Sequence, residues 1–167
     1  MPRGETENLN ELTQQGFAGS ALFDKTFDEG MALVEETARY LDGKGREESR
    51  DLPRKAAMLY AGESMRVTTR LMQAASWLLV QRAVHDGDME ADAAAQDRYR
   101  LGSREICLGK SGEGVEALPP FLQDLLTRSD HLYRRIARLD QVLFGDGGPA
   151  AGARGQLDTL AQAFGTD

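Results

Sequence analysis

Residues 60–79, YAGESMRVTTRLMQAASWLL, decide the fold of this chain. The stretch begins as an amphipathic helix and ends apolar on nearly every side. One apolar seam follows alternating spacings of three and four residues, as on one side of a helix: Met58, Ala61, Met65, Thr68, Met72, Ala75 and Leu79. A second apolar face consists of Val67, Leu71, Ala74, Trp77 and Leu78. A helix that is apolar on two faces packs between two others, so this segment is predicted to be the central helix of a bundle.

The same spacing predicts a helix on each side of this one. Ser20 is the predicted N-cap of the first helix, which ends near Asp42 before two glycines. Its apolar stripe consists of Phe23, Phe27, Met31, Val34, Ala38 and Leu41. The central helix is predicted to run from about Leu52 to about His85. The last long helix opens at Pro119 and Pro120, and its stripe consists of Leu122, Leu125, Ser129, Leu132, Ile136, Leu139 and Leu143.

The connections carry weaker signals. Residues 43–51 read as a charged connection, residues 89–101 as an Ala-rich helix with Asp88 as its N-cap, and residues 102–117 as a Gly-rich loop. Nothing predicts a β-strand, because no period-two alternation or hairpin dipeptide separates apolar runs. We therefore predict an all-α fold, an antiparallel three-helix bundle over residues 20–144, with a short helical insertion between helices two and three. Residues 1–19 and 145–167 are predicted to be flexible tails.

The C-terminal tail contains a short amphipathic segment. After the Gly/Ala/Pro-rich linker 145–155, Leu157, Leu160, Ala161 and Phe164 stand at i, i+3, i+4 and i+7. A flexible linker followed by such a segment is typical of a helix presented to a partner's groove. Leu157, Leu160 and Phe164 are therefore candidate partner-binding residues; the alternative is a frayed tail with incidental apolar residues.

Composition restricts the class of function. The net charge of -7 argues against nucleic-acid backbones and anionic membranes as partners, and is compatible with a partner that has a basic patch. Cys107 is the only cysteine, which excludes an internal disulfide and suits a reducing cytoplasm. The first twenty residues contain no signal peptide and no apolar run is long enough to span a membrane. The sequence thus predicts a soluble, cytoplasmic protein.

No motif predicts catalysis, a cofactor or a metal. His85 and His131 are the only histidines; they fall on different helices, and no metal-ligand spacing accompanies them. Gly109-Lys110-Ser111 lacks the first glycine and the preceding strand of a phosphate-binding loop. No serine or cysteine stands beside a base in a nucleophile motif. We expect two ordinary surface histidines and no enzyme active site.

Three polar groups of the central helix are of greater interest. Glu63, Arg66 and Arg70 share one face beside the methionine seam. They are interpreted as inter-helix ion pairs that fix register, with Glu35 or Glu36 as partners; the alternative is a polar docking strip for a partner. Met58, Met65 and Met72 are interpreted as core, the alternative being an adaptable groove. Residues 98–110 form a local positive patch on an acidic protein.

Several longer strings resemble a small bacterial family: EGMALVEE (29–36), YLD (40–42), GREES (45–49), ESMRVTTRLMQ (63–73) and ASWLL (75–79). The chain is similar, over roughly residues 22–144, to the regulator of CtrA degradation family. The resemblance implies a three-helix bundle that dimerises, carries a disordered C-terminal tail and has no catalytic activity. It also implies an adaptor that, with priming regulators, helps deliver the response regulator CtrA to the ClpXP protease. No family binding residue is mapped onto this chain.

Two other functions stay open from the sequence. One is a dimeric helical scaffold or interaction protein unconnected to a protease. The other is a small-ligand sensor that uses the methionine seam, for which a cavity of a few hundred Å³ between the first two helices would be required. A two-fold homodimer is expected if the apolar surface of the long helices exceeds what one protomer covers.

Overall fold

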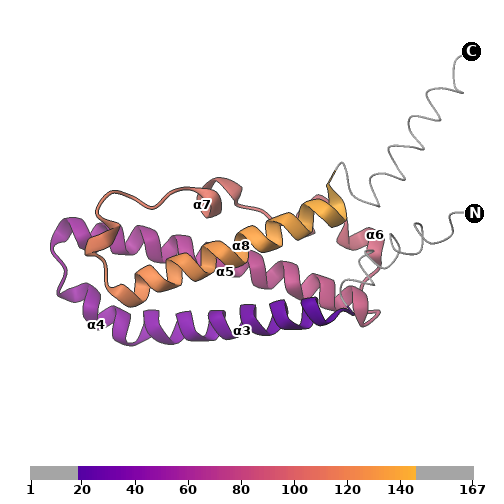
Figure 1. Cartoon of the computed structure of the whole chain (residues 1–167), viewed down its shortest axis with the longest axis horizontal. Coiled ribbons are helices and arrows are strands. Elements are labelled where there is room, and N and C mark those ends of the chain that lie inside the picture. Colours follow the sequence, from indigo (N-terminus) through magenta and orange to yellow (C-terminus); the bar gives the residue numbers. More distant parts are fainter. Residues whose placement is uncertain (1–18, 146–167) are drawn as a thin grey trace, which may run out of the picture.

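Three long helices form the body of the molecule (Figure 1). The structure, a computed structural model, describes residues 19–145, and within this range every regular element is helical. The long helices are α3 (Ala21–Asp42), α5 (Arg54–His85) and α8 (Pro120–Phe144). The prediction of an all-α bundle with an insertion between the second and third long helices is confirmed. Apart from Gly19 and Gly145, both predicted tails lie outside the described residues.

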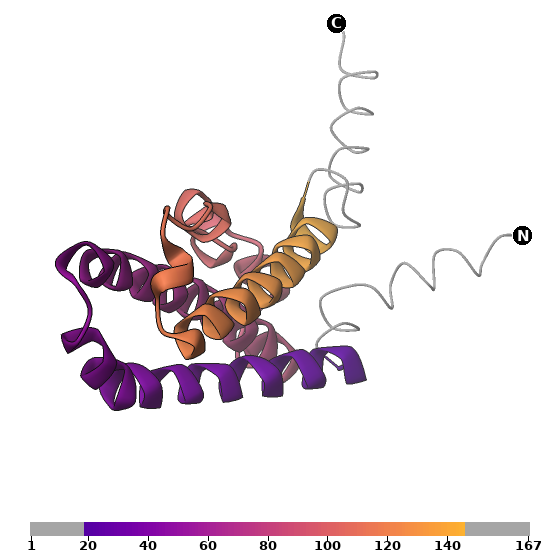
Figure 2. The ribbon, with the colours of Figure 1, turned by 60° about the vertical axis from the view of Figure 1, so that its left-hand side comes forward.

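The direction of the helices follows from the pairs between them. α3 runs antiparallel to α8, because Glu29 pairs with Arg135 and Glu36 with Arg128. α5 and α8 run parallel, since Arg70 reaches Asp130 and Trp77 reaches Asp140. The predicted antiparallel order therefore holds for α3 against its neighbours but not for α5 against α8. The insertion 86–119 returns the chain along the bundle before α8 begins, which allows two consecutive long helices to share a direction (Figure 2).

Helix α3 begins and ends where the sequence indicates. The Ser20 side chain accepts a hydrogen bond from the Phe23 amide at 3.2 Å, and the Gly43 amide bonds the Tyr40 carbonyl at 3.2 Å. The buried face is rotated from the predicted stripe and consists of Phe23, Thr26, Gly30, Leu33, Thr37 and Tyr40. Gly30 permits this rotation: a Cβ there would lie 2.9 Å from Cδ1 of Leu78. The missing side chain lets α3 lie close to α5 at this point.

The charged connection after α3 is itself helical. Helix α4 (Lys44–Arg50) turns the chain between α3 and α5, where the sequence suggested only a linker. A Cβ on Gly45 would lie 2.6 Å from the Tyr60 hydroxyl oxygen and 2.8 Å from the Tyr40 carbonyl oxygen. The Tyr40 hydroxyl donates to Glu48 at 3.1 Å. The corner is thus packed by the two tyrosines against a glycine backbone.

Helix α5 buries the second of its two predicted apolar faces. Trp77 and Leu78 are 1% and 0% exposed, and Val67, Leu71 and Ala74 are also buried. The interpretation of the methionine seam as core is wrong for the protomer, because Met58, Met65 and Met72 are 69%, 71% and 67% exposed. Helices α3 and α8 and the insertion all pack on the other sides of α5. The seam consequently faces solvent.

The insertion contains less helix than predicted at its start and more at its end. Within residues 89–101 only α6 (Ala91–Ala94) and the 3-10 turn Asp97–Tyr99 form. The segment predicted as a loop contains α7 (Arg104–Leu108) and a second 3-10 turn, Val115–Ala117. Ala94, Leu101 and Cys107 are all buried, and α6 and α7 pack against the long helices. These tertiary contacts determine the short elements. Local propensity is too weak to fix helices of this length.

Helix α8 matches its prediction closely. It opens with Pro120 in its first turn, and Leu122, Leu125, Ser129, Leu132, Ile136 and Leu143 are buried as expected. Asp140 is buried on the same face, at 0% exposure. This carboxylate in the core is the first sign of a polar network that joins the insertion to the bundle.

Candidate interaction site

The carboxylate of Glu63 holds the far end of the insertion. It is 3% exposed and accepts hydrogen bonds from the Ser111 hydroxyl at 3.1 Å and from the Gly112 amide at 3.2 Å. Arg66 lies one turn away, donates from Nε to the same carboxylate at 3.2 Å, and donates from Nη1 to the Ile106 carbonyl. Glu63 and Arg66 therefore bind the backbone of the insertion at two separate points.

Arg70 is the most deeply buried cation of this group. It is 3% exposed and donates to the carbonyls of Cys107 at 2.9 Å and Leu126 at 3.0 Å. It also reaches the Asp130 carboxylate at 3.3 Å. Burial lowers the pKa of the guanidinium, and Asp130 opposes that change. A buried Arg with several backbone acceptors fixes three elements, α5, α7 and α8, in one arrangement.

These contacts identify the partners of Glu63, Arg66 and Arg70, the three polar residues singled out in the sequence. Neither Glu35 nor Glu36 is its partner: Glu35 pairs with Arg39 within α3, and Glu36 pairs with Arg128 of α8. The trio instead connects α5 to α7 and α8. Helix α7, which these residues hold, presents Ile106 at the surface, where this residue is 51% exposed. The three residues thus position α7, and any effect of theirs on a partner would act through the surface that α7 presents.

A second polar cluster secures the start of α7. Asp140 accepts from Trp77 Nε1 at 3.0 Å and from Arg100 Nη2 at 2.9 Å, and Arg104 Nη2 lies 3.7 Å away. The Tyr133 hydroxyl donates to the Gly102 carbonyl at 2.7 Å. Burial raises the pKa of Tyr133 to about 12. The buried carboxylate and the buried phenol thereby hold residues 100–104 on the bundle.

The same contacts change the interpretation of the positive patch at residues 98–110. Arg100 and Arg104 both face the Asp140 carboxylate, whose single negative charge offsets one of their two positive charges. Arg98 lies over the Tyr99 ring, 4.7 Å from its centroid. The patch is therefore less positive than the sequence suggests.

A ridge of large apolar side chains runs along the exposed side of α5. Met58, Met65, Met72 and Leu79 follow one another at intervals of seven residues and are 69%, 71%, 67% and 53% exposed. We call these four residues the α5 ridge. Side chains of this kind at heptad spacing are normally buried in a helix–helix interface. Large apolar side chains exposed along one face of a helix are typical of an interaction surface.

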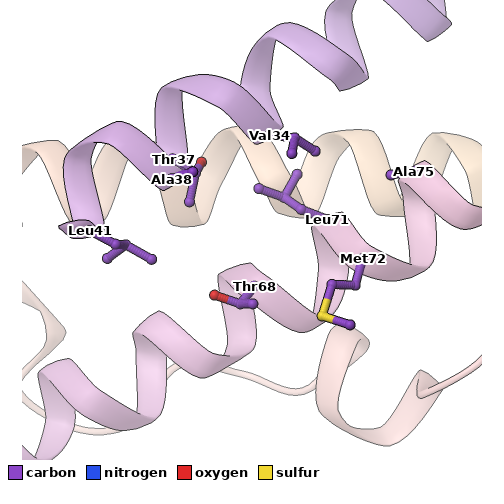
Figure 3. A pocket seen from close by; sticks show the side chains of 8 residues that line it. All are labelled: Val34, Thr37, Ala38, Leu41, Thr68, Leu71, Met72 and Ala75. Atoms are coloured by element: carbon purple, nitrogen blue, oxygen red, sulfur yellow. The ribbon is translucent and has the colours of Figure 1, made fainter.

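Beside the ridge lies a groove between α3 and α5, which we call the α3–α5 groove (Figure 3). Its volume is about 210 Å³, and it is lined by Val34, Thr37, Ala38, Leu41, Thr68, Leu71, Met72 and Ala75. Met72 lines the groove (Figure 3) and is also a member of the ridge, so the two surfaces meet at this residue. The groove includes Val34, Ala38 and Leu41 of the predicted α3 stripe, which are therefore surface residues at its wall.

The other predicted site residues cannot be placed. Leu157, Leu160 and Phe164 lie outside the described residues. In residues 19–145 no group of His, Cys, Asp and Glu side chains is arranged to hold a metal ion. Within the same range no helix has both the length and the apolarity needed to cross a bilayer.

Comparison with known proteins assigns the chain to a family. The family model described as "Protein of unknown function (DUF1465)" matches residues 14–164. The chain belongs to the DUF1465 family, the family of the regulator of CtrA degradation. A search of curated proteins finds no significant match.

A solved structure of a DUF1465 protein is similar to this chain. The crystal structure of RcdA from Caulobacter crescentus CB15 matches with 53% sequence identity and a TM-score of 0.65. The match covers 78% of this chain and 97% of the RcdA chain. The resemblance found in the sequence strings is thereby confirmed.

Sequence reasoning did not identify Asp140, the centre of the second polar cluster that holds the insertion on the bundle. Asp140 stands four residues after Ile136 and seven after Tyr133, on the apolar face of the predicted last helix. A carboxylate at such a position indicates a buried charge with a cationic partner. That signal was available from the sequence, but the identity of the partner, Arg100, was not.

Proposed function

We propose that this protein is a non-enzymatic adaptor in regulated proteolysis that helps deliver a CtrA-like response regulator to the ClpXP protease. The observation that carries this proposal is the similarity to RcdA, at 53% identity over 97% of the RcdA chain. At this level of identity over a whole chain, we expect the surfaces used for protein partners to be shared. The proposed location is the cytoplasm, where the protease and a response regulator would both be found.

The chemistry of the described residues supports an adaptor over an enzyme. The buried charged groups, Glu63, Arg70 and Asp140, are each satisfied by partners inside the chain, and they hold the insertion in place. The exposed features are apolar surfaces, which suit protein partners. An adaptor accelerates proteolysis by raising the local concentration of its cargo at the protease, and it needs no reaction centre to do so.

We further propose that the protein is a homodimer that pairs through the α5 ridge. Four large apolar side chains at heptad spacing on one long helix present a self-complementary strip to a second copy. Burial of three methionines and a leucine would remove the largest exposed apolar strip that α5 carries. A two-fold pairing of this kind would place two cargo-binding surfaces on one particle.

The α3–α5 groove does not favour the ligand-sensor alternative. Its volume of about 210 Å³ lies below the range of roughly 300–1,000 Å³ typical of small-molecule pockets. Its lining offers the hydroxyls of Thr37 and Thr68 as the only polar side-chain groups. A specific small ligand would require more orienting groups than these.

The test is a reconstituted degradation assay with ClpXP, the priming regulators and the cognate CtrA-like substrate. Addition of the full chain is expected to accelerate loss of the substrate. A second version, truncated after Gly145, is included to separate the role of the bundle from that of residues 146–167. Acceleration by both versions would locate cargo delivery in the bundle. No acceleration by either, with the priming regulators present, would contradict the adaptor role and favour a dimeric scaffold.

A further inference from the structure

A small polar pocket lies between α5 and the 3-10 turn Asp97–Tyr99 at the start of the insertion. Its volume is about 140 Å³, and it is lined by Gln73, Ser76, Trp77, Val80, Arg98, Tyr99 and Arg100. We call it the insertion pocket. None of its lining residues belongs to the α5 ridge or lines the α3–α5 groove. The volume lies below the roughly 300 Å³ at which typical small-molecule sites begin, so the pocket suits one side chain of a partner.

Two walls of the insertion pocket are held in place by contacts within the chain. The guanidinium of Arg100 binds Asp140 through Nε at 3.0 Å and Nη2 at 2.9 Å, and its Nη1 donates to the Phe144 carbonyl at 3.2 Å. On another wall, the Gln73 side chain accepts a hydrogen bond from the Gly102 amide at 2.9 Å. Walls that are fixed before a partner arrives lower the entropic cost of binding.

The remaining polar groups of the insertion pocket are not used within residues 19–145. Arg98 is exposed, its guanidinium lies over the Tyr99 ring, and it forms no ion pair with any carboxylate of this range, the adjacent Asp97 included. In the same range the hydroxyls of Ser76 and Tyr99 make no hydrogen bond. No Asp or Glu lines the pocket. The pocket therefore combines an uncompensated cation with hydroxyl donors, on a chain whose net charge is -7.

We propose that the insertion pocket binds the side-chain carboxylate of a glutamate on a protein partner, with Arg98 as the cation. Guanidinium and carboxylate form charge-assisted hydrogen bonds, often two in parallel. Trp77 and Val80 supply apolar surface for the methylene groups of the glutamate. A free anion would gain only an exposed ionic contact, which is worth little in water, whereas a peptide also buries its neighbouring groups. The inference goes beyond the adaptor proposal and does not depend on it.

The test uses the full-length protein labelled with ¹⁵N. Trp77 is the only tryptophan and lines the pocket, so its single indole N–H resonance reports on occupancy. The probes are the peptides acetyl-Gly-Glu-Gly-amide and acetyl-Gly-Gln-Gly-amide, which differ by one charge. The glutamate peptide is expected to shift the resonance in a saturable way, and the glutamine peptide to leave it in place. Arg98→Gln is expected to weaken binding of the glutamate peptide roughly tenfold or more, because a hydrogen bond between charged groups is lost.

Arg138→Gln is the matched control, because Arg138 is an exposed arginine of α8 that does not line the pocket, and it should leave binding unchanged. Equal shifts with both peptides, or no shift with either, would overturn the proposal, as would a shift that persists in Arg98→Gln. Inorganic phosphate that binds more tightly than the glutamate peptide, with the same dependence on Arg98, would make the pocket a site for a free anion instead. Because no measurement involves the protease, a failure here is distinguishable from a failure of the adaptor proposal.

Discussion

The indole Nε1 of Trp77 donates a 3.0 Å hydrogen bond to Oδ1 of Asp140, joining the C-terminal half of α5 to the last turns of α8. Asp140 also binds Arg100 of the insertion, so one carboxylate connects three parts of the chain. Both partners of the hydrogen bond lie in the core, at 1% and 0% exposure. The carboxylate is therefore an anchor for the insertion, and its removal should affect the entire bundle.

Replacement of Asp140 by Ala is expected to lower the free energy of unfolding by about 3 kcal/mol, the lower end of the range for breaking a buried ion pair. The lower end applies because the Arg100 side chain is 23% exposed and can still reach water. Urea denaturation gives the free energy directly. Asp124→Ala, which removes an exposed partner of Arg128 from the same helix, should cost less than about 1 kcal/mol. Equal losses for the two variants would argue against the anchoring role.

The attachment of α7 gives a second prediction. In Arg70→Met the carbonyls of Cys107 and Leu126 lose their donor, while the bulk of the side chain is largely kept. We expect faster hydrogen exchange of the amides of residues 104–112, measured by mass spectrometry, because local opening of this segment becomes easier. Arg134→Met is the control, since Arg134 also pairs with Asp130 but has a side chain that is 46% exposed. If both variants left the exchange of α7 unchanged, Arg70 would not be its anchor.

The alkaline limit of stability gives a third prediction. Burial raises the pKa of Tyr133 to about 12, whereas an exposed tyrosine titrates near 10. Between these values the unfolded chain loses the proton that the folded chain keeps, so stability decreases as the pH rises. The contribution is complete below about 10 and is lost on approach to about 12. Tyr133→Phe should weaken this dependence of the denaturation midpoint between those pH values, and an unchanged dependence would contradict the assignment.

The corner between α3 and α5 gives a fourth prediction. A Cβ on Gly45 would meet the Tyr60 hydroxyl and the Tyr40 carbonyl at 2.6 Å and 2.8 Å, and the carbonyl belongs to the backbone and cannot easily move. Gly45→Ala should therefore destabilise the protein by about 1–3 kcal/mol, as overpacked sites do. Gly62→Ala is the control, because a Cβ there has no neighbour within 4 Å, and alanine is favoured over glycine in a helix. A thermal shift assay on both variants suffices, and a stable Gly45→Ala protein would exclude the predicted clash.

The sequence was sufficient for α8 and for the ends of α3 because these features are local. The Ser20 side chain caps α3 by accepting a hydrogen bond from the amide of Phe23, three residues later. Pro120 opens α8 within a regular apolar repeat. The choice between the two apolar faces of α5 is not local. Either face could be buried on periodicity alone, and the face of Trp77 is chosen because α8 supplies Asp140 and the leucines of its stripe. The solvent position of Met65 follows from that choice.

The candidate site was predictable only in part for the same reason. Glu63, Arg66 and Arg70 could be grouped from their spacing on one helix, but their partners lie far away in the sequence, at Gly112, Ile106 and Cys107. The short helix α7 that they hold is determined by these contacts. A segment of five residues is too short for its own propensity to predict it.

The α5 ridge gives the last prediction, which tests the proposed homodimer. Met65→Lys places a charge in the centre of the ridge, and a charge without a partner is costly to bury in an interface. We expect the variant to be a monomer at concentrations where the unmodified protein is a dimer, as measured by light scattering after gel filtration. Because Met65 is 71% exposed in the protomer, the substitution removes no core contact, and the variant should remain folded by circular dichroism.

Val142→Lys is the matched control for this experiment. Val142 is also an exposed apolar residue, at 50%, but it lies on α8, away from the ridge. It should leave the mass of the dimer unchanged. If Val142→Lys dissociated the dimer and Met65→Lys did not, the two copies would pair through α8. The exposed methionines of the α5 ridge would then have to bind a partner other than a second copy.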